Sequence, residues 1–456
     1  MSLSKILSLI IHASMDTKRT LFSNAIVLFM ASILFASCCG IDIINQTHFI
    51  SDSKNESLIS SIGNFKLGFF SPGNSPSRYV GIWFNKVSKQ TVVWVANREI
   101  PLNKSAGIFK IAADGNLAVV DSKGRTPLWS TNISMPNANS SAKLLPSGNL
   151  VLVVKNNSDN SESIVWQSFD YPTDTILPGM RFGLNRETGL NQFLTSWKSS
   201  DDPAPGDFSF GLNPNGSPQY FLYRNQTPYW RGGPWNGRSL SGTPDISTGV
   251  KSNRPDFSNE AGFLNYSFVS NKQGTYITFY LRNTSVFSSM VLEPTGIVKR
   301  VTWREDSQDW ALFWLEPDGS CDVYANCGSY SICNFNNAIK CSCLPGFEPL
   351  SPHDWHSRCV EKGKFQCGKG AGEGFLKIAN VKIPDATRTR AYTNLSLKEC
   401  EMECLRSCNC SGYASLDINN EGQGCLAWYG ELNDMQQYTD EGQDFHLRVE
   451  AGELGK

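Results

Sequence analysis

Neither sign of charge is in excess in this sequence, which has 41 Lys and Arg residues, 42 Asp and Glu residues and a formal net charge of -1. No run of like charge is present that could follow a phosphate backbone, so nucleic acid is not an expected partner. Extended Pro or Ser repeats are also missing, which argues against a structural cell-wall protein. At 456 residues the chain has room for several domains.

Cysteine is absent between Gly40 and Ser320. Cys38 and Cys39 lie near the N-terminus, and the other twelve cysteines lie between Cys321 and Cys425. An even number within about a quarter of the chain predicts disulfides, and therefore an oxidising compartment outside the cytosol.

No convincing amphipathic helix is found from residue 41 to about residue 314. Short β-type runs alternate there with Gly, Pro, Asn, Asp and Ser clusters, which predicts an all-β region. A weak repeat supports this: residues 114–117 (DGNL) precede an apolar run and Trp129, and residues 147–150 (SGNL) precede another and Trp166. We expect the tryptophans of this region to pack in the cores of small sheets. They are Trp83, Trp94, Trp129, Trp166, Trp197, Trp230 and Trp235.

The N-terminus has the pattern of an export signal. Lys18 and Arg19 precede the apolar run 25–35, which is followed by small residues up to Gly40. We predict a signal peptide at residues 1–40, with an uncleaved signal anchor as the alternative.

Twelve Asn-x-Ser/Thr sequons support the same compartment, and each is a candidate glycosylation site on the surface. They begin at Asn45, Asn55, Asn103, Asn132, Asn139, Asn156, Asn215, Asn225, Asn265, Asn283, Asn394 and Asn409.

The cysteine-rich region divides into two parts. From Cys321 to Cys359 there is almost no apolar run, so disulfides are expected to replace a core. Residues 395–408 (LSLKECEMECLRSC) instead have helical spacing, with Cys400 and Cys404 one turn apart on one face.

Catalytic and metal sites are not predicted. His353, His356 and Cys359 could be imagined as metal ligands, but the surrounding cysteines have disulfide spacing. Asp170 and Asp174 flank a predicted turn. Their carboxylates are expected to cap backbone amides rather than to form an acid/base pair. The Gly-rich stretch 368–374 has the character of a linker. No cofactor is expected.

Four long motifs, in order, resemble those of plant S-locus glycoproteins and of the extracellular region of S-domain (G-type lectin) receptor-like serine/threonine kinases. They are VVWVANRE (92–99), WQSFDYPTDTILPG (166–179), SWKSSDDPAPGDFS (196–209) and YWRGGPWNG (229–237). The resemblance implies tandem bulb-lectin-like β-prism units, then a disulfide-rich EGF-like module and an α+β PAN/apple domain. The implied ranges are 41–160 for a bulb-type mannose-lectin domain, 161–315 for the S-locus glycoprotein domain as a second lectin-like unit, 316–360 for the EGF-like module, 361–450 for the PAN/apple domain and 451–456 for a tail.

The family's disulfide pattern implies five pairs and leaves Cys367 and Cys408 as the sixth. The five are Cys321 with Cys333, Cys327 with Cys341, Cys343 with Cys359, Cys400 with Cys425, and Cys404 with Cys410.

Bulb-type lectins that bind mannose use the motif Gln-x-Asp-x-Asn-x-Val-x-Tyr, and two eroded copies are present here. Since each good hydrogen bond contributes about 1 kcal/mol net, most mannose affinity is expected to be lost. The matching residues are Asp114 and Asn116 in the first copy and Asn149 and Val151 in the second. The replacements are Ala112, Ala118 and Val120 in the first copy and Leu145, Ser147 and Val153 in the second.

The resemblance implies a secreted protein, or one on the outer face of the plasma membrane, that recognises an extracellular peptide or small cysteine-rich protein. A homodimer, a receptor kinase and glycans are further implied partners, and a mannose-binding lectin is the alternative function. After Val449 only EAGELGK follows, without kinase motifs, so no enzyme is predicted and the sequence leaves open a soluble form or a truncated receptor. The polar stretch 236–265 is the expected place for recognition loops.

Overall fold

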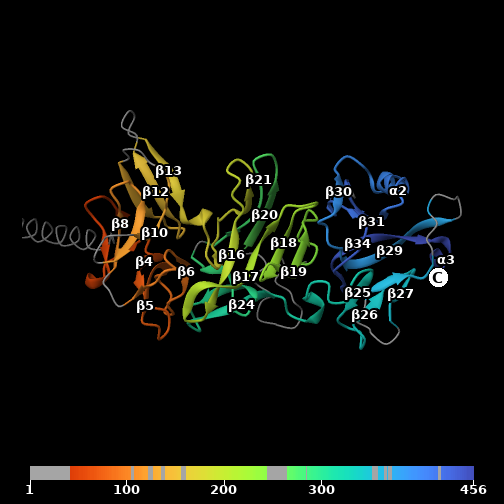
Figure 1. Ribbon diagram of the computed structural model, residues 1–456, viewed down its shortest axis with the longest axis horizontal. Coiled ribbons are helices and arrows are strands. Elements are labelled where there is room, and N and C mark those ends of the chain that lie inside the picture. Colours follow the sequence, from red (N-terminus) through yellow and green to blue (C-terminus); the bar gives the residue numbers. More distant parts are fainter. Residues whose placement is uncertain are drawn as a thin grey trace, which may run out of the picture.

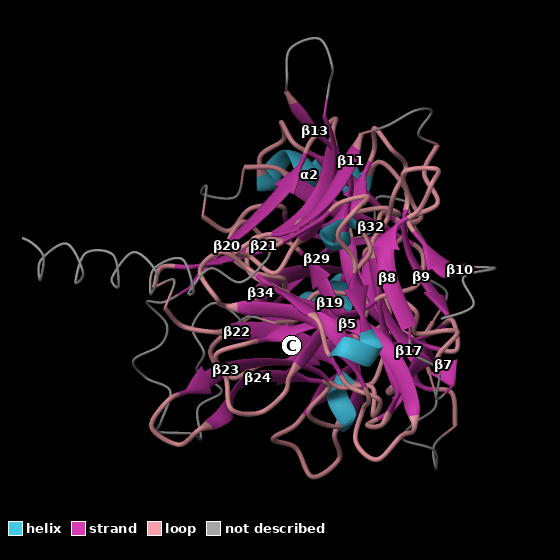
Figure 2. Cartoon of the chain, turned by 90° about the vertical axis from the view of Figure 1, so that its left-hand side faces the viewer, coloured by secondary structure: helices cyan, strands magenta, loops and turns pink. Residues whose placement is uncertain are grey.

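The computed structural model describes residues 42–103, 107–121, 127–134, 139–155, 161–243, 264–283, 285–351, 358–363, 367, 372–419 and 423–455. Strands make up nearly all of its regular structure (Figure 2). Two β-units and then the cysteine-rich region follow one another along the long axis of the molecule (Figure 1). The predicted mainly β fold, with an α+β part at the C-terminal end, is confirmed.

The first β-unit contains three antiparallel sheets. The 3-10 turn η1 (Asp52–Lys54) separates β2 from β3. One sheet has β3 (Ser57–Ile59), β4 (Phe65–Phe70), β5 (Ser77–Phe84) and β6 (Val92–Val95), with β7 (Leu102–Asn103) paired to β5; the second has β2 (Ile50–Ser51), β8 (Gly107–Ile111), β9 (Leu117–Asp121) and β10 (Pro127–Ser130); the third has β1 (Ile43–Ile44), β11 (Ser140–Leu144), β12 (Leu150–Lys155) and β13 (Glu162–Gln167).

Each of these sheets contributes one tryptophan to a common centre. Trp94, Trp129 and Trp166 lie on β6, β10 and β13, and their ring centroids are 5.6, 5.8 and 6.0 Å apart in edge-on contacts. Trp94 and Trp166 are buried and Trp129 is half-buried. Edge-on rings pack densely and bury large apolar areas, so three short sheets can share one core. The expected tryptophan packing is confirmed: Trp94, Trp166 and Trp230 are buried, and the half-buried rings of Trp83, Trp129, Trp197 and Trp235 pack against hydrophobic clusters.

The second β-unit repeats the three-sheet arrangement. The 3-10 turn η2 (Ser168–Asp170) leads into it from β13. Its sheets are β16 (Phe193–Ser199), β17 (Asp202–Asn213), β18 (Gln219–Arg224) and β19 (Thr227–Pro234); β15 (Phe182–Asn185), β21 (Gly274–Leu281) and β20 (Leu264–Ser270); and β14 (Thr175–Ile176), β22 (Ser288–Leu292), β23 (Val298–Arg304) and β24 (Asp309–Glu316).

The two β-units are packed against each other over a continuous apolar core. Buried residues from Ile44 to Trp314 form one hydrophobic cluster. Polar contacts also cross the junction: Arg98 donates hydrogen bonds to the carbonyls of Thr195, Ser196 and Pro203. Strand β13 pairs with β12, so the last sheet of the first unit extends beyond residue 160, the boundary implied by the resemblance.

One eight-stranded sheet joins the EGF-like and PAN-like parts of the cysteine-rich region, and two further strands form a separate pair. Strand β25 of the EGF-like segment pairs in parallel with β33, with Ile332 opposite Met435. Leu344, which is 1% exposed, belongs to the same hydrophobic cluster as Leu447 of the PAN-like part. The expectation that disulfides replace a core in the EGF-like segment therefore needs correction, because this segment also uses the core of its neighbour.

The elements of this region are η5 (Ser320–Asp322), β25 (Ser331–Asn334), β26 (Cys341–Cys343), β27 (Phe347–Pro349), β28 (Cys359–Glu361), β29 (Glu373–Lys382), β30 (Thr389–Tyr392), α2 (Leu397–Leu405), β31 (Cys410–Ser415), β32 (Cys425–Tyr429), β33 (Met435–Gln437), β34 (Gln443–Glu450) and α3 (Ala451–Leu454). The sheet order is β26-β25-β33-β29-β34-β31-β32-β30, and β27 pairs with β28.

Helix α2 lies within the predicted range 395–408. Ser396 accepts a hydrogen bond from the amide of Glu399, whose side chain bonds back to Ser396, so a capping box fixes the start of the helix. Cys400 and Cys404 are buried on one face of the helix, as its spacing predicts.

Candidate functional site

The two copies of the sugar-binding motif adopt the same tight turn. The amide of Ala112 donates to the carbonyl of Asn116, and the amide of Leu145 donates to the carbonyl of Asn149. Gly115 and Gly148 both have φ of 85°, a conformation that glycine adopts without strain. The repeat seen in the sequence is thus a repeated turn between neighbouring strands.

The asparagine of each copy directs its side chain into the protein. Asn116 is 5% exposed; its amide nitrogen donates to Asp114 and to the carbonyl of Ile133, and its oxygen accepts from the hydroxyl of Thr131 and the amide of Ile133. These contacts use both donors and both acceptor positions of the amide group. Asn116 therefore ties β9 to the segment after β10.

Asn149 has an equivalent role in the second copy. Its amide nitrogen donates to Gln167, and its oxygen accepts from the hydroxyl of Ser168 and the amide of Phe169. Val151, the other matching residue, is 2% exposed in β12. The replacing residues Ala118, Val120 and Val153 are also buried and offer no polar group. The asparagine side chains of both copies therefore hold neighbouring strands of one sheet together and leave few groups for sugar hydroxyls.

Replacing Asn116 with alanine should destabilise the protein by about 1–3 kcal/mol, because the Thr131 hydroxyl and the Ile133 amide would lose their partner. Urea denaturation followed by tryptophan fluorescence measures this effect. Asp114→Ala is the matched control, since the exposed side chain of Asp114 bonds only to Asn116 within the described residues. Equal stability of Asn116→Ala and wild type would contradict the structural role.

Asp170 and Asp174 do not form an acid/base pair. The Asp170 carboxylate accepts a hydrogen bond from the Gln167 side chain rather than capping a backbone amide, which corrects the expectation for this residue. Asp174 is 7% exposed and accepts from the hydroxyl of Thr173. Burial raises the pKa of Asp174 to about 6, although the charge of Arg98 and the hydrogen bonds lower it in part.

Asp174 lines a cleft of about 380 Å³ at the junction of the two β-units. The half-buried rings of Trp197 and Trp310 and the rim residue Ser200 also face this space. Sequence reasoning missed the cleft because its walls come from segments far apart in the chain. Its apolar walls further include Phe70, Pro72, Val92, Val291, Leu292 and Val301.

A second, more polar cavity of about 300 Å³ lies on the sheet β3-β4-β5 of the first unit. Asn55, Ser57 and Lys66 line it together with Trp83. The ammonium group of Lys66 lies 5.8 Å from the centroid of the Trp83 ring. Asn55 begins one of the predicted sequons, so this cavity adjoins a candidate glycosylation site.

The side chains of the predicted sequon asparagines are exposed wherever the structure describes them, as attachment of a glycan requires. Asn156 and the side chain of Asn103 lie outside the described part. The exposed ones are Asn45, Asn55, Asn132, Asn139, Asn215, Asn225, Asn265, Asn283, Asn394 and Asn409.

Six disulfides join the twelve cysteines of the C-terminal region. The pairs are Cys321–Cys333, Cys327–Cys341, Cys343–Cys359, Cys367–Cys408, Cys400–Cys425 and Cys404–Cys410.

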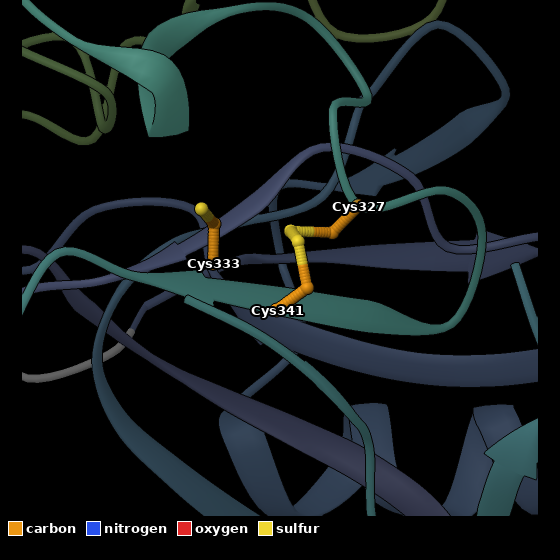
Figure 3. Close-up of side chains that lie close together, drawn as sticks. All are labelled: Cys327, Cys333 and Cys341. Atoms are coloured by element: carbon orange, nitrogen blue, oxygen red, sulfur yellow. A yellow bond between two sulfur atoms is a disulfide. The ribbon is translucent and has the colours of Figure 1, made fainter. Parts of the chain in front are cut away.

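Three cysteine sulfurs lie close enough together to suggest a metal site. The sulfurs of Cys327, Cys333 and Cys341 lie within 4.8 Å of one another in the described part of the chain. The sulfurs of Cys327 and Cys341 are bonded to each other (Figure 3), and Cys333 is bonded to Cys321, so none of the three offers a thiolate. His353 and His356 lie outside the described residues.

The stretch 236–265 is described only at its two ends. Asn236 is 3% exposed and accepts from the amides of Arg238 and Ser239, so residues 236–243 form a turn in which Arg238 is exposed and the residues from 239 to 243 are buried. Asn265 lies in β20. Residues 244–263, and likewise 368–371 of the Gly-rich stretch, lie outside the described part, whereas Glu373 and Gly374 begin β29.

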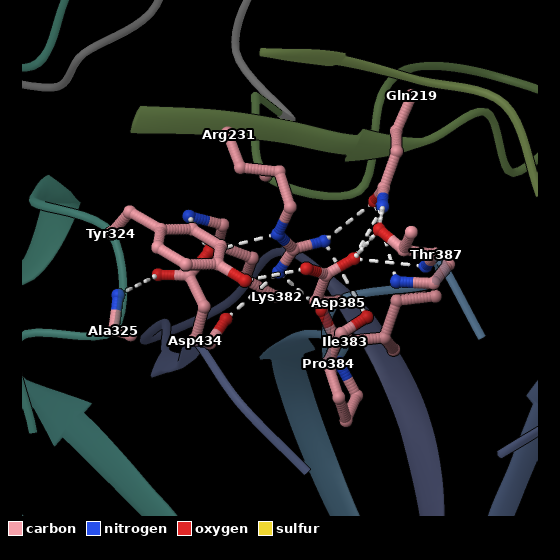
Figure 4. A network of polar contacts seen from close by, with 12 residues as sticks. Gln219, Arg231, Tyr324, Ala325, Lys382, Ile383, Pro384, Asp385, Thr387 and Asp434 are labelled. Carbon is pink, nitrogen blue, oxygen red and sulfur yellow. Dashed lines mark hydrogen bonds and ion pairs between the residues drawn. The ribbon is translucent and has the colours of Figure 1, made fainter. Parts of the chain in front are cut away.

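A buried polar network joins the second β-unit to the cysteine-rich region (Figure 4). Arg231 of β19 is 0% exposed; its Nε lies 2.8 Å from the Asp434 carboxylate, and the Lys382 ammonium lies 2.9 Å from the same oxygen. Arg231 also donates to the carbonyl of Ile383 at 2.8 Å. One carboxylate thus serves two buried cations, and neither was singled out in the sequence because their partners lie far away in the chain.

A second carboxylate extends the network to the EGF-like segment. Asp385 accepts hydrogen bonds from Gln219 at 2.6 Å and from the hydroxyl of Tyr324 at 2.5 Å. Although burial acts in the opposite direction, the Arg231 charge and the hydrogen bonds from Thr387 and Tyr324 lower the pKa of Asp385, which keeps the carboxylate charged. Three parts of the chain are thereby held in one orientation.

Two β-units of three sheets each, followed by a disulfide-bonded region, are the architecture of a lectin-type recognition protein. Three family models match the chain: D-mannose binding lectin at residues 91–198, S-locus glycoprotein domain at 230–351 and PAN-like domain at 367–435. The S-locus-specific glycoprotein S6 of Brassica oleracea is 38% identical over 94% of this chain and 96% of its own length. This chain belongs to the family of S-locus glycoproteins and S-domain receptor kinases.

The receptor-like serine/threonine-protein kinase SD1-8 of Arabidopsis thaliana is 39% identical over 95% of this chain. The chain spans about half the length, 49%, of that relative. Among solved structures, a monomeric mannose-binding lectin of Gastrodia elata matches 28% of this chain and 96% of its own, with 20% identity and a TM-score of 0.21. Among the helices of the described residues, none has the length and apolar character needed to cross a membrane.

Proposed function

We propose that this chain recognises an extracellular peptide or small protein, within the S-domain recognition role that its relatives support. The observation that carries the proposal is the inward orientation of Asn116 and Asn149, whose amide groups hydrogen-bond the end of the neighbouring strand in the same sheet. A site that has lost its hydrogen-bonding groups gains little from sugar hydroxyls. The relatives imply an extracellular location or one on the outer face of the membrane.

The cleft between the β-units is the contact site that we propose for this ligand. Its volume of about 380 Å³ and its aromatic and aliphatic walls suit one or two apolar side chains of a peptide. Asp174 at its inner wall could accept hydrogen bonds from the peptide backbone or from a basic side chain. Trp197 and Trp310 supply the large apolar surfaces that commonly anchor protein ligands.

Peptide display on the secreted protein, followed by binding measurements on the Ser200→Trp variant, tests both the ligand class and the site. Ser200 is exposed at the rim, so an indole there should block the cleft and weaken selected peptides by about 10-fold or more. Ser307→Trp, at an exposed position in the loop after β23, is the matched control and should bind as wild type does.

A glycan array on the same protein decides between the two functional classes. Weak or absent mannose binding is expected from the inward asparagines. Strong mannose-selective binding, lost in Asn116→Ala and Asn149→Ala variants that remain folded, would overturn the proposal in favour of a lectin.

The residue ranges implied by the resemblance remain proposals, with β13 added to the first unit. A signal peptide at residues 1–40, occupied sequons, a homodimer and association with a receptor kinase are likewise proposed features of this protein.

A further inference from the structure

The polar cavity of the first β-unit is open because of a glycine. Ser57, Gly68 and Gly81 lie opposite one another on β3, β4 and β5. A Cβ atom at Gly68 would lie 3.3 Å from both the Ser57 Cβ and the Trp83 ring, so a side chain there would fill the floor of the cavity. Trp83 therefore presents part of its ring to a space of about 300 Å³.

Asn55 stands at the edge of this space in a fixed backbone conformation. It ends the turn η1 with φ of 53°, and its amide donates to the carbonyl of Asp52 at 3.0 Å. Its exposed side chain lines the cavity, and so does Ser57, the third residue of the same sequon. No hydrogen bond holds the Asn55 side-chain amide within the described residues, so its nitrogen is available for attachment.

We propose that the first N-acetylglucosamine of a glycan on Asn55 folds into this cavity and covers the ring of Trp83. The proposal rests on the expected export of the chain. On attachment, the Asn55 side-chain nitrogen bonds to C1 of the sugar, the bond from C1 to the oxygen of a lipid pyrophosphate donor breaks, and the amide loses one proton.

The surroundings fit the two kinds of surface on this sugar. The apolar C–H face of the ring and the acetyl methyl group can pack on the indole, which supplies a large apolar surface. The hydroxyl groups face polar side chains at the rim, among them Asn85 and Gln90. Since the sugar is covalently attached beside the cavity, its local concentration is high and it excludes a free sugar from the same place.

Removal of glycans from the native protein by peptide N-glycosidase, which converts each glycosylated Asn to Asp, tests the proposal site by site in mass spectrometry. Asn225 is the internal control: it is exposed, has a similar φ of 48°, and lies in the turn between β18 and β19. Release at Asn55 should be about 10-fold slower than at Asn225, since the covered linkage must first leave the cavity. In the Trp83→Ala variant the rate at Asn55 should rise to that at Asn225.

A second measurement needs no variant. In the protein trimmed to one N-acetylglucosamine per site, nuclear Overhauser contacts are expected between the acetyl methyl group on Asn55 and the Trp83 indole. An unoccupied Asn55, equal release rates at the two sites, or absence of these contacts would overturn the proposal. Each of these results would leave the proposed peptide recognition at the separate cleft unaffected.

Discussion

Replacing Asp434 with asparagine will lower the free energy of unfolding by about 3–5 kcal/mol, because two buried cations lose the carboxylate that they share. The side chains of Arg231 and Lys382 are 0% and 1% exposed, so water cannot replace the Asp434 carboxylate. Asparagine has nearly the same shape and its side-chain oxygen can still accept hydrogen bonds, so the loss of charge is the main change. Urea denaturation, followed at several wavelengths, measures this decrease in the free energy of unfolding.

The matched control is Asp444→Asn in the same PAN-like region. Asp444 pairs with Lys377, and the two side chains are 43% and 58% exposed. Exposed pairs contribute about 0–1 kcal/mol, so this variant should unfold close to wild type. If the two variants behave alike, the network around Arg231 does not hold the domains together as we infer.

Replacing Asp174 with asparagine will stabilise the protein at pH 7 by about 3 kcal/mol and will change its pH dependence. The pKa of Asp174 is about 6 in the folded protein against an ordinary value of 3.8, chiefly because of burial. The folded state therefore holds this proton more tightly than the unfolded chain does. The contribution of Asp174 to stability is greatest below the ordinary value, decreases as the pH rises to about 6, and stays low above it.

The measurement is the difference in stability between Asp174→Asn and wild type at several pH values from 4 to 7.5. This difference should increase with pH up to about 6 and then level off. Asp201→Asn, which removes an exposed carboxylate nearby, is the control for the loss of one negative charge. A constant difference for Asp174→Asn would mean that its carboxylate ionises as freely in the folded protein as in the unfolded chain.

The sequence predicts much of the fold because its signals are local. Alternating apolar residues specify strands, Gly115 and Gly148 specify repeated turns, and the spacing of Cys400 and Cys404 specifies a helix face. Each signal lies within a few residues of the element that it forms. Pairing between remote segments has no such local sign, which is why the parallel contact of β25 with β33 was not foreseen.

The candidate site could be predicted only in part. The loss of motif residues such as Tyr, replaced here by Val120 and Val153, is visible in the sequence and argues against mannose binding. The inward hydrogen bonds of Asn116, however, depend on Thr131 and Ile133, which follow the end of the neighbouring strand. The buried position of Asp174 likewise depends on packing between two units, and its sequence context shows only a turn.

The shared sheet of the EGF-like and PAN-like segments has a practical consequence for engineering chimeras with relatives. Because β25 is hydrogen-bonded to β33 and Leu344 packs with Leu447, a graft that exchanges one segment alone would have to rebuild a strand interface. A functional exchange should instead transfer residues 320–450 as one piece, so that the Cys321–Cys333 disulfide stays intact, together with the partners of Arg231. In such hybrids, a difference in ligand specificity that maps to either segment would then be a property of the joined EGF-like and PAN-like region as a whole.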